Sequence, residues 1–223
     1  EGFWAKHKED TTKESDRYKY ANPDKQEAYD NATEVTKALI NKDTGAYADQ
    51  ATVEKLTEAE NKAWNELNGV VNAAKNAIDQ AAKTKNDAID GSNLTDEEKS
   101  GLHQQVTDEV NTAKAAIDAA TKDADVESAK NTGVEKINNI NVPDTSANKD
   151  AAKKAIDQAA QTKDDAIDKS NLTAEEKADL KKQVSDAANE AKGNIDAATK
   201  DADVESAKNT GVEKINNINV PDT

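Results

Sequence analysis

Residues 117–145 and residues 195–223 have the same sequence, IDAATKDADVESAKNTGVEKINNINVPDT. Because Ile117 corresponds to Ile195, the two copies are 78 residues apart. The same spacing relates the segment SNLT at residues 92–95 to the SNLT at residues 170–173. Self-similarity at a fixed period indicates a repeat architecture. The sequence therefore predicts two tandem units that share one fold.

Each unit is expected to contain three helices. In the first unit, the first helix ends near Gly91, and the second opens at Thr95 and Glu98, which are spaced as a capping box. The third stops before Pro143, because proline disfavours helical geometry in the residue that precedes it. The apolar residues of the second helix are spaced by three or four residues, as in a bundle: Leu102, Val106, Val110, Ala113, Ile117 and Ala120.

Two glycines, Gly133 and Gly211, fall inside the third helix of each unit. Glycine within a helix costs about 1 kcal/mol relative to alanine. A close helix crossing and a break in the helix are both compatible with the sequence at these positions.

The N-terminal part differs in composition from the repeats. It contains all seven aromatic residues of the chain: Phe3, Trp4, Tyr18, Tyr20, Tyr29, Tyr47 and Trp64. The sequence of this part also predicts three helices. They run from about Phe3 to Arg17, from Pro23 onwards, and from about Gln50 to Leu67, with a turn at residues 42–45 before the last of them. We expect three modules, at residues 1–69, 70–145 and 146–223.

The predicted fold class is all-α, with tandem three-helix bundles stacked end to end into an elongated rod. Three antiparallel helices bring the chain into a bundle at one end and out at the other, so each unit advances the chain by one bundle length. Helices of roughly 20 residues with a rise of 1.5 Å per residue give about 30 Å per unit, and three units on the order of 90–100 Å.

Composition excludes several classes of partner. The net charge is −15, from 30 Lys and Arg against 45 Asp and Glu, and so acidic a chain is a poor ligand for nucleic acid or anionic membranes. No apolar run approaches the ~20 residues that span a bilayer, and we expect this segment to lack a signal peptide. The absence of cysteine removes disulfides and thiolate metal sites. We expect a monomer.

The sequence offers little for catalysis. His7 lies in a run of charge, and His103 is expected to be an exposed helix residue. The segment 123–125, Asp-Ala-Asp, lacks the further ligands of a calcium loop and is better explained as an acidic helix start. We therefore predict no catalytic, cofactor-binding or metal-binding residue.

The tyrosines supply the candidate ligand contacts. Tyr29 and Trp64 fall on apolar stripes, which favours core packing. Tyr18, Tyr20 and Tyr47 lie in predicted loops, where an aromatic ring with a polar tip suits either a wet rim or a contact surface.

Two resemblances cover nearly the whole chain. ANPDKQEAYDNA at residues 21–32, with Ala38-Leu39-Ile40-Asn41 and Leu67-Asn68-Gly69, resembles the FIVAR module found in various architectures. The repeats contain AIDQAA, NLTxEEK, IDAAT and GVEKINNI. They resemble the tandem helical repeats of unknown function in giant Gram-positive cell-wall-anchored surface adhesins of the extracellular-matrix-binding and biofilm-accumulation type.

These resemblances imply an extracellular, cell-wall-attached region with a stalk role, and for the FIVAR-like module a binding or sugar-contact role. They supply no ligand residues. The leading hypothesis is a structural spacer that projects a distal binding region from the cell wall, without a cofactor. The alternative is a module that binds a host matrix protein, an immunoglobulin or a glycan. An enzyme is a third alternative.

Overall fold

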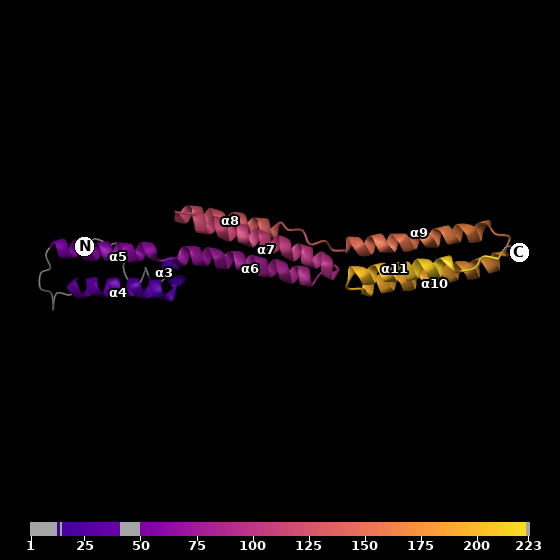
Figure 1. Ribbon diagram of the computed structural model, residues 1–223, viewed down its shortest axis with the longest axis horizontal. Coiled ribbons are helices and arrows are strands. Elements are labelled where there is room, and N and C mark those ends of the chain that lie inside the picture. Colours follow the sequence, from indigo (N-terminus) through magenta and orange to yellow (C-terminus); the bar gives the residue numbers. More distant parts are fainter. Residues whose placement is uncertain (1–12, 14, 41–49, 222–223) are drawn as a thin grey trace. The chain divides into compact units, whose positions relative to one another are not determined.

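The computed structural model describes residue 13, residues 15–40 and residues 50–221. Within these residues all regular secondary structure is α-helical, as Figure 1 shows, which confirms the all-α prediction. The residues form two compact units. One contains the chain up to residue 83 together with residues 107–139, and the other contains residues 84–106 and 140–223.

The N-terminal segment contributes helices α3 (Asp16–Lys19), α4 (Pro23–Ile40) and α5 (Gln50–Glu66). Helix α4 begins at Pro23, where the missing N–H of proline carries no cost. Helices α4 and α5 pack against each other around a small core of Ala21, Tyr29, Ala63 and Leu67.

Most of the predicted helix from Phe3 to Arg17, and the turn at residues 42–45, lie outside the described residues. Val35 of α4 is 50% exposed, so it lies outside this core.

The first repeat forms helices α6 (Gly69–Asp90), α7 (Asp96–Ala119) and α8 (Asp123–Asn138). Residues 67 and 68 separate α5 from α6, so the two helices are not continuous. The predicted capping box is confirmed, with Thr95 N donating to Glu98 Oε1 at 2.9 Å and Glu98 N donating to Thr95 Oγ1 at 3.2 Å. Six buried residues make a core from all three helices: Ala74, Ile78, Ala113, Ile117, Val126 and Ile137.

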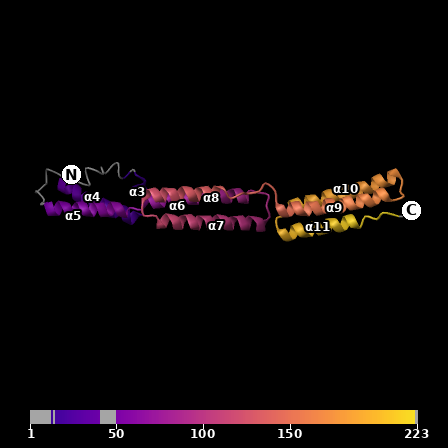
Figure 2. The same cartoon turned by 90° about the horizontal axis from the view of Figure 1, so that it is seen from above.

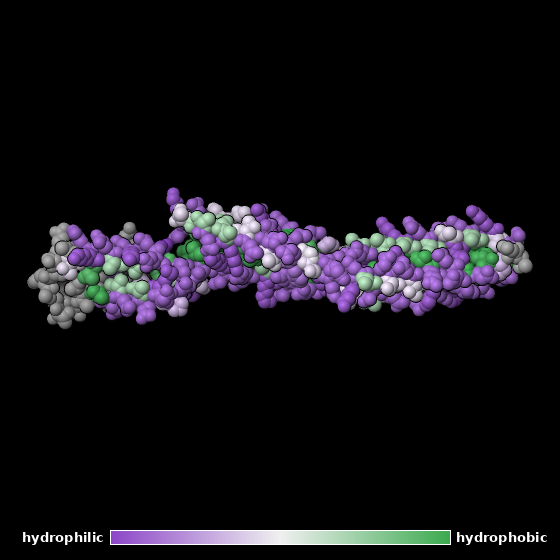
Figure 3. Space-filling view, viewed as in Figure 1, coloured by the Kyte–Doolittle hydropathy of each residue, from purple (hydrophilic) through white to green (hydrophobic). Residues whose placement is uncertain are grey.

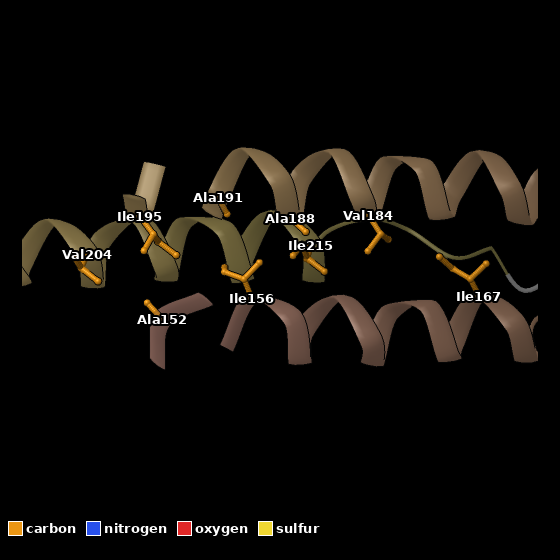
Figure 4. Close-up of a cluster of buried hydrophobic side chains, with 9 residues drawn as sticks. All are labelled: Ala152, Ile156, Ile167, Val184, Ala188, Ala191, Ile195, Val204 and Ile215. Carbon is orange, nitrogen blue, oxygen red and sulfur yellow. The ribbon is translucent and has the colours of Figure 1, made fainter. Parts of the chain in front are cut away.

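The second repeat forms α9 (Ala147–Lys169), α10 (Ala174–Ala197) and α11 (Asp201–Asn216), and each of these helices packs against the other two (Figure 2). Ser146 caps α9, and Thr173 and Glu176 form a second capping box at α10. Figure 4 shows the buried side chains, among them Ile156 and Ile195, pointing into the space between the helices.

The two mid-helix glycines mark close helix crossings, because α8 and α11 run through them without a break. A β-carbon built on Gly133 would lie 2.7 Å from Ile78 Cδ1, and one on Gly211 would lie 2.7 Å from Ile156 Cδ1. Only glycine allows the third helix to approach so near.

The chain enters and leaves the second repeat at opposite ends. At the start of α9, Asn148 Nδ2 donates to Asp201 Oδ1 at 2.9 Å, so α9 and α11 begin side by side. Lys163, which is 15 residues or about 22 Å further along α9, donates from Nζ to the carbonyl oxygens of Asn216 at 3.0 Å and Ile218 at 2.9 Å. The chain thus advances along the bundle axis as it passes through this repeat.

Candidate contact surface and helix junctions

Tyr18 lies in helix α3, so its prediction as a loop residue is wrong, and it belongs to the edge of the N-terminal core. Its ring lies 6.0 Å from that of Tyr29 in an edge-on arrangement, and Tyr29 in turn lies 5.9 Å from Trp64. Tyr29 is fully buried and Trp64 is half-buried against the same core. The hydroxyl of Tyr18 lies 3.0 Å from both carboxylate oxygens of Asp30. Tyr18 is therefore half-buried and already engaged within the module.

Tyr20 is the more exposed of the two described candidate tyrosines, with 41% of its surface accessible. Lys19 Nζ lies 5.6 Å from the centre of the Tyr20 ring. The backbone carbonyl oxygen of Tyr20 accepts a hydrogen bond of 2.7 Å from Asn72 Nδ2. The backbone of Tyr20 is thus hydrogen-bonded to α6, and the residue remains exposed. Tyr47 lies outside the described residues.

A groove of about 320 Å³ lies beside Tyr20. It is lined by small residues of α6, including Ala73 and Ala77, and by Glu127 and Lys130 of α8. The second repeat has the corresponding groove, of about 540 Å³, between α9 and α11. The first groove differs from the second in having a tyrosine at its rim.

Arg17, the only arginine in the sequence, joins the N-terminal helices to the first repeat. Its Nε donates to the carbonyl oxygen of Trp64 at 2.8 Å, and Nη2 donates to that of Asn65 at 3.0 Å. Its guanidinium carbon lies 5.2 Å from the centre of the Trp64 ring, and Nη1 lies 3.3 Å from Asp123 Oδ2. The Arg17 guanidinium thus donates hydrogen bonds to carbonyl oxygens at the end of α5 and pairs with the acidic start of α8.

The start of α6 is pressed against the same junction. A β-carbon on Gly69 would collide with the backbone carbonyl oxygens of Asp16 and Arg17, so this position requires glycine. Asn68 Oδ1 accepts from Asn22 N at 2.9 Å, which ties the start of α4 to the start of α6. The second repeat has Ala147 where the first has Gly69.

The junction between the two repeats depends on carboxylates instead. Glu98 of α7 accepts from Ser146 Oγ at 2.6 Å through Oε1 and from Asn148 N at 3.3 Å through Oε2. Glu97 accepts from Asp201 N at 3.2 Å. Glu98 therefore closes the capping box of α7 and also helps to cap α9, the first helix of the following repeat.

A backbone contact completes this junction. Asp96 N donates to the carbonyl oxygen of Thr199 at 2.8 Å. The hydrogen bonds join the start of α7 to both the start of α9 and the connection between α10 and α11. The repeats are therefore held together by hydrogen-bonded helix ends as well as by the covalent chain.

Hydrogen bonding shifts the pKa of Glu98. Partial burial alone would raise the pKa of this carboxyl, but the bonds from Ser146 Oγ, Thr95 N and Asn148 N together lower it below its ordinary value of 4.5. The pKa of Glu176, the equivalent residue in the second repeat, is lowered by the backbone and hydroxyl of Thr173. The charged forms of both carboxyls are the ones that fit these helix ends.

His103 lies on α7 and is half-buried against α6, so the prediction of an exposed histidine is wrong. Its Nδ1 lies 2.7 Å from Asn86 Oδ1, and its Nε2 lies 2.7 Å from Asp90 Oδ1. The equivalent Lys181 bonds Asp168, which raises the pKa of the lysine. Both residues link the first and second helices of their repeats.

In the described part of the chain, no group of three or more His, Asp or Glu side chains is placed to hold a metal ion. The acidic segment at residues 123–125 instead starts α8, with Asp123 paired to Arg17.

Hydrophilic side chains predominate over the repeats on the face shown in Figure 3. No described helix combines the length and the apolar character that crossing a bilayer requires.

The arrangement described above defines an all-α tandem-repeat protein whose three-helix bundles are joined through hydrogen-bonded helix ends. The chain belongs to the family described as Domain of Unknown Function (DUF1542), which matches residues 70–145 and residues 148–223.

Several curated relatives come from Staphylococcus aureus. Extracellular matrix-binding protein ebh of strain MW2 is 27% identical over 198 residues, which is 86% of this chain but 2% of that protein. Extracellular matrix-binding protein EbhB of strain Newman is 32% identical over 130 residues, or 51% of this chain and 2% of that protein. The chain thus spans only about one fiftieth of the length of these relatives.

Among solved structures, the crystal structure of a domain of EbhA from Staphylococcus aureus is 20% identical to this chain, with a TM-score of 0.29. The comparison covers 91% of this chain and 94% of that one.

Proposed function

We propose that this chain is a structural spacer within a bacterial cell-surface adhesin, and that it projects a distal binding region away from the cell wall. One observation carries the proposal. The chain enters the second repeat where Asn148 meets Asp201 and leaves it beside Lys163, at the opposite end of the bundle. Each added repeat of this kind increases reach, whereas an even number of helices would return the chain to its starting end.

The relatives support the cellular setting of this proposal. They are very long proteins named for extracellular matrix binding, and a short repeat segment of such a protein is suited to a mechanical role. We propose an extracellular, wall-attached, monomeric and non-catalytic segment. Its modules are residues 1–69, of the FIVAR type, and the repeats at residues 70–145 and 146–223, stacked end to end as a rod on the order of 90–100 Å long.

Small-angle X-ray scattering on the 223-residue chain tests the spacer proposal directly. A rod of this length has a radius of gyration of about 28 Å, because the value for a thin rod is its length divided by the square root of twelve. A compact globule of the same chain length would give about 17 Å, and an unfolded chain about 50 Å. A measured value near 17 Å would refute the spacer.

A second candidate function is ligand binding at the N-terminal module. The exposed ring of Tyr20 at the rim of the groove between α6 and α8 favours it, because tyrosine is enriched at the centres of protein interfaces. The partner would be a host matrix protein, an immunoglobulin or a glycan. Saturable binding that Tyr20→Ala abolishes and Tyr18→Phe leaves intact would support this function. Binding that is indifferent to Tyr20→Ala would place the contact at another surface.

A further inference from the structure

The start of α7, in the first repeat, is the surface on which the second repeat docks. It holds the second repeat through the Asp96 backbone N–H and through the carboxylates of Glu97 and Glu98. The groups that these three bind are the carbonyl oxygen of Thr199, the amides of Asp201 and Asn148, and the Ser146 hydroxyl.

The start of α10 carries the same groups. Residues 173–177 read TAEEK where residues 95–99 read TDEEK, so a single position differs. That position is Asp96 in the first repeat, and the contact with Thr199 uses its backbone N–H, which Ala174 also provides. The capping boxes match as well. Glu176 Oε1 lies 2.9 Å from Thr173 N, and Glu176 N lies 3.1 Å from Thr173 Oγ1. The carboxylate of Glu176 is thus held in the orientation that Glu98 adopts.

Burial distinguishes the occupied surface from the open one. Thr95 is 0% exposed and Glu98 is half-buried, whereas Thr173 and Glu176 are exposed. The local helix start is the same at both places, so the burial of Thr95 reflects the repeat that covers it.

We propose that the start of α10, around Ala174, Glu175 and Glu176, is a docking site for a further repeat of the same kind. This proposal rests on the proposed spacer role. It specifies a partner whose first helix begins with Ser-x-Asn and whose second connection reads Thr-Lys-Asp, as in residues 146–148 and 199–201. The hydroxyl and backbone amides of such a partner are neutral donors that fit two ionised carboxylates.

The first repeat shows how a different neighbour is selected. Its first helix has Asn68 and Val70 where the second repeat has Ser146 and Asn148, and Arg17 of the N-terminal module contacts its Asp123. Asn68 has no hydroxyl to offer a carboxylate such as Glu98, and its Oδ1 instead accepts from Asn22 N of the N-terminal module. A serine before the first helix therefore fits a preceding repeat, and an asparagine there fits the N-terminal module.

The test is to extend the chain after Thr223 with a second copy of residues 146–223 and to measure amide hydrogen exchange by NMR. We expect exchange at the Ala174 amide to slow about tenfold, as for a hydrogen bond of ordinary net strength, and Glu176→Gln in the extended chain to remove most of that protection. The matched control extends the chain with residues 68–145 instead. This copy keeps Thr-Lys-Asp at residues 121–123 but has Asn68 in place of the serine, so it should protect Ala174 less.

Unchanged exchange at Ala174 in the chain extended by residues 146–223 overturns the proposal, as does equal protection by the two extensions. An appended copy that fails to fold also counts against it, because the same sequence folds behind the start of α7. Scattering from the unextended chain tests the spacer role separately. A compact 223-residue particle would refute the spacer whatever Ala174 shows, and an elongated one with an indifferent Ala174 would refute only the docking site.

Discussion

Gly133 faces Ala113 so closely that a β-carbon on the glycine would stand 2.5 Å from the alanine Cβ. Gly211 meets Ala191 in the same way in the second repeat. Two non-bonded carbon atoms cannot lie this close, so a side chain at either glycine would force one of the helices to move. The glycines therefore set the spacing between the second and third helices of each bundle, and their cost in helix propensity is offset by close packing.

We expect Gly211→Ala to lower the free energy of unfolding by about 1–3 kcal/mol, because the added methyl group overpacks the crossing with Ala191 and Ile156. The control is Gly193→Ala in α10, where a β-carbon would meet nothing within 4 Å. There alanine should stabilise the helix by up to about 1 kcal/mol. Thermal unfolding followed by circular dichroism measures both. Equal stabilisation by the two substitutions would show that α11 does not depend on this close approach.

The periodic features of the sequence predicted the fold well, whereas the contacts between modules could not be predicted. Apolar steps of three and four residues identify the buried face of a helix, and a capping box identifies where it begins, because both depend on neighbours in sequence. The partners of Arg17 include Trp64, 47 residues away, and Asp123, 106 residues away. No local pattern encodes such pairings, although the presence of a single arginine among 30 basic residues was an available signal.

The candidate site illustrates the same limit. Tyr18 and Tyr20 are two residues apart and equally loop-like in sequence. One is half-buried against Tyr29 and the other is exposed beside a groove. This difference arises from the way in which α3 packs on α4 and α6, which composition does not report.

Arg17→Lys should weaken the first junction. A lysine ammonium cannot donate to the carbonyl oxygens of Trp64 and Asn65 in the fixed geometry of the guanidinium, and it loses the stacking on the Trp64 ring. We expect the N-terminal module to lose about 1–2 kcal/mol of stability. Urea unfolding followed by Trp64 fluorescence, in a Trp4→Phe background, measures this change.

The matched control for Arg17→Lys is Lys62→Ala on α5. Lys62 lies 4.0 Å from Glu66 on an exposed helix face, and such pairs contribute about 0.5 kcal/mol or less. A loss for Arg17→Lys no greater than that for Lys62→Ala would mean that the guanidinium contacts add nothing to the stability of the module.

Lys163→Met should loosen the end of the second repeat. The ammonium group donates to the carbonyl oxygens of Asn216 and Ile218, and methionine keeps the aliphatic length but has no donor. We expect a loss of about 1–2 kcal/mol and faster amide exchange after α11. Lys154→Met, at an exposed position of the same helix, is the control and should change stability by less than about 0.5 kcal/mol. Equal effects of the two substitutions would contradict the capping role of Lys163.

The junction between the repeats should weaken in acid. Because the pKa of Glu98 lies below its ordinary value of 4.5 in the folded chain, its contribution to stability is fully present above pH 4.5 and is lost as the pH falls through the lowered pKa. The Asn148 amide, which donates to Glu98 Oε2, reports on this loss locally. We expect its protection factor, corrected for the intrinsic exchange rate at each pH, to be constant above pH 4.5 and to fall below it.

Two variants separate this effect from the general loss of capping in acid, since the pKa of Glu176 is lowered as well. Glu98→Gln cannot ionise, so the protection of Asn148 should be lower at neutral pH and should no longer depend on pH between 4.5 and 3. Glu176→Gln removes the equivalent charge from α10 and should leave the pH profile of Asn148 unchanged. If Glu98→Gln retained the acid-dependent fall, the group that titrates at the junction would be another carboxyl, and the ionised Glu98 would not be what holds the start of α9.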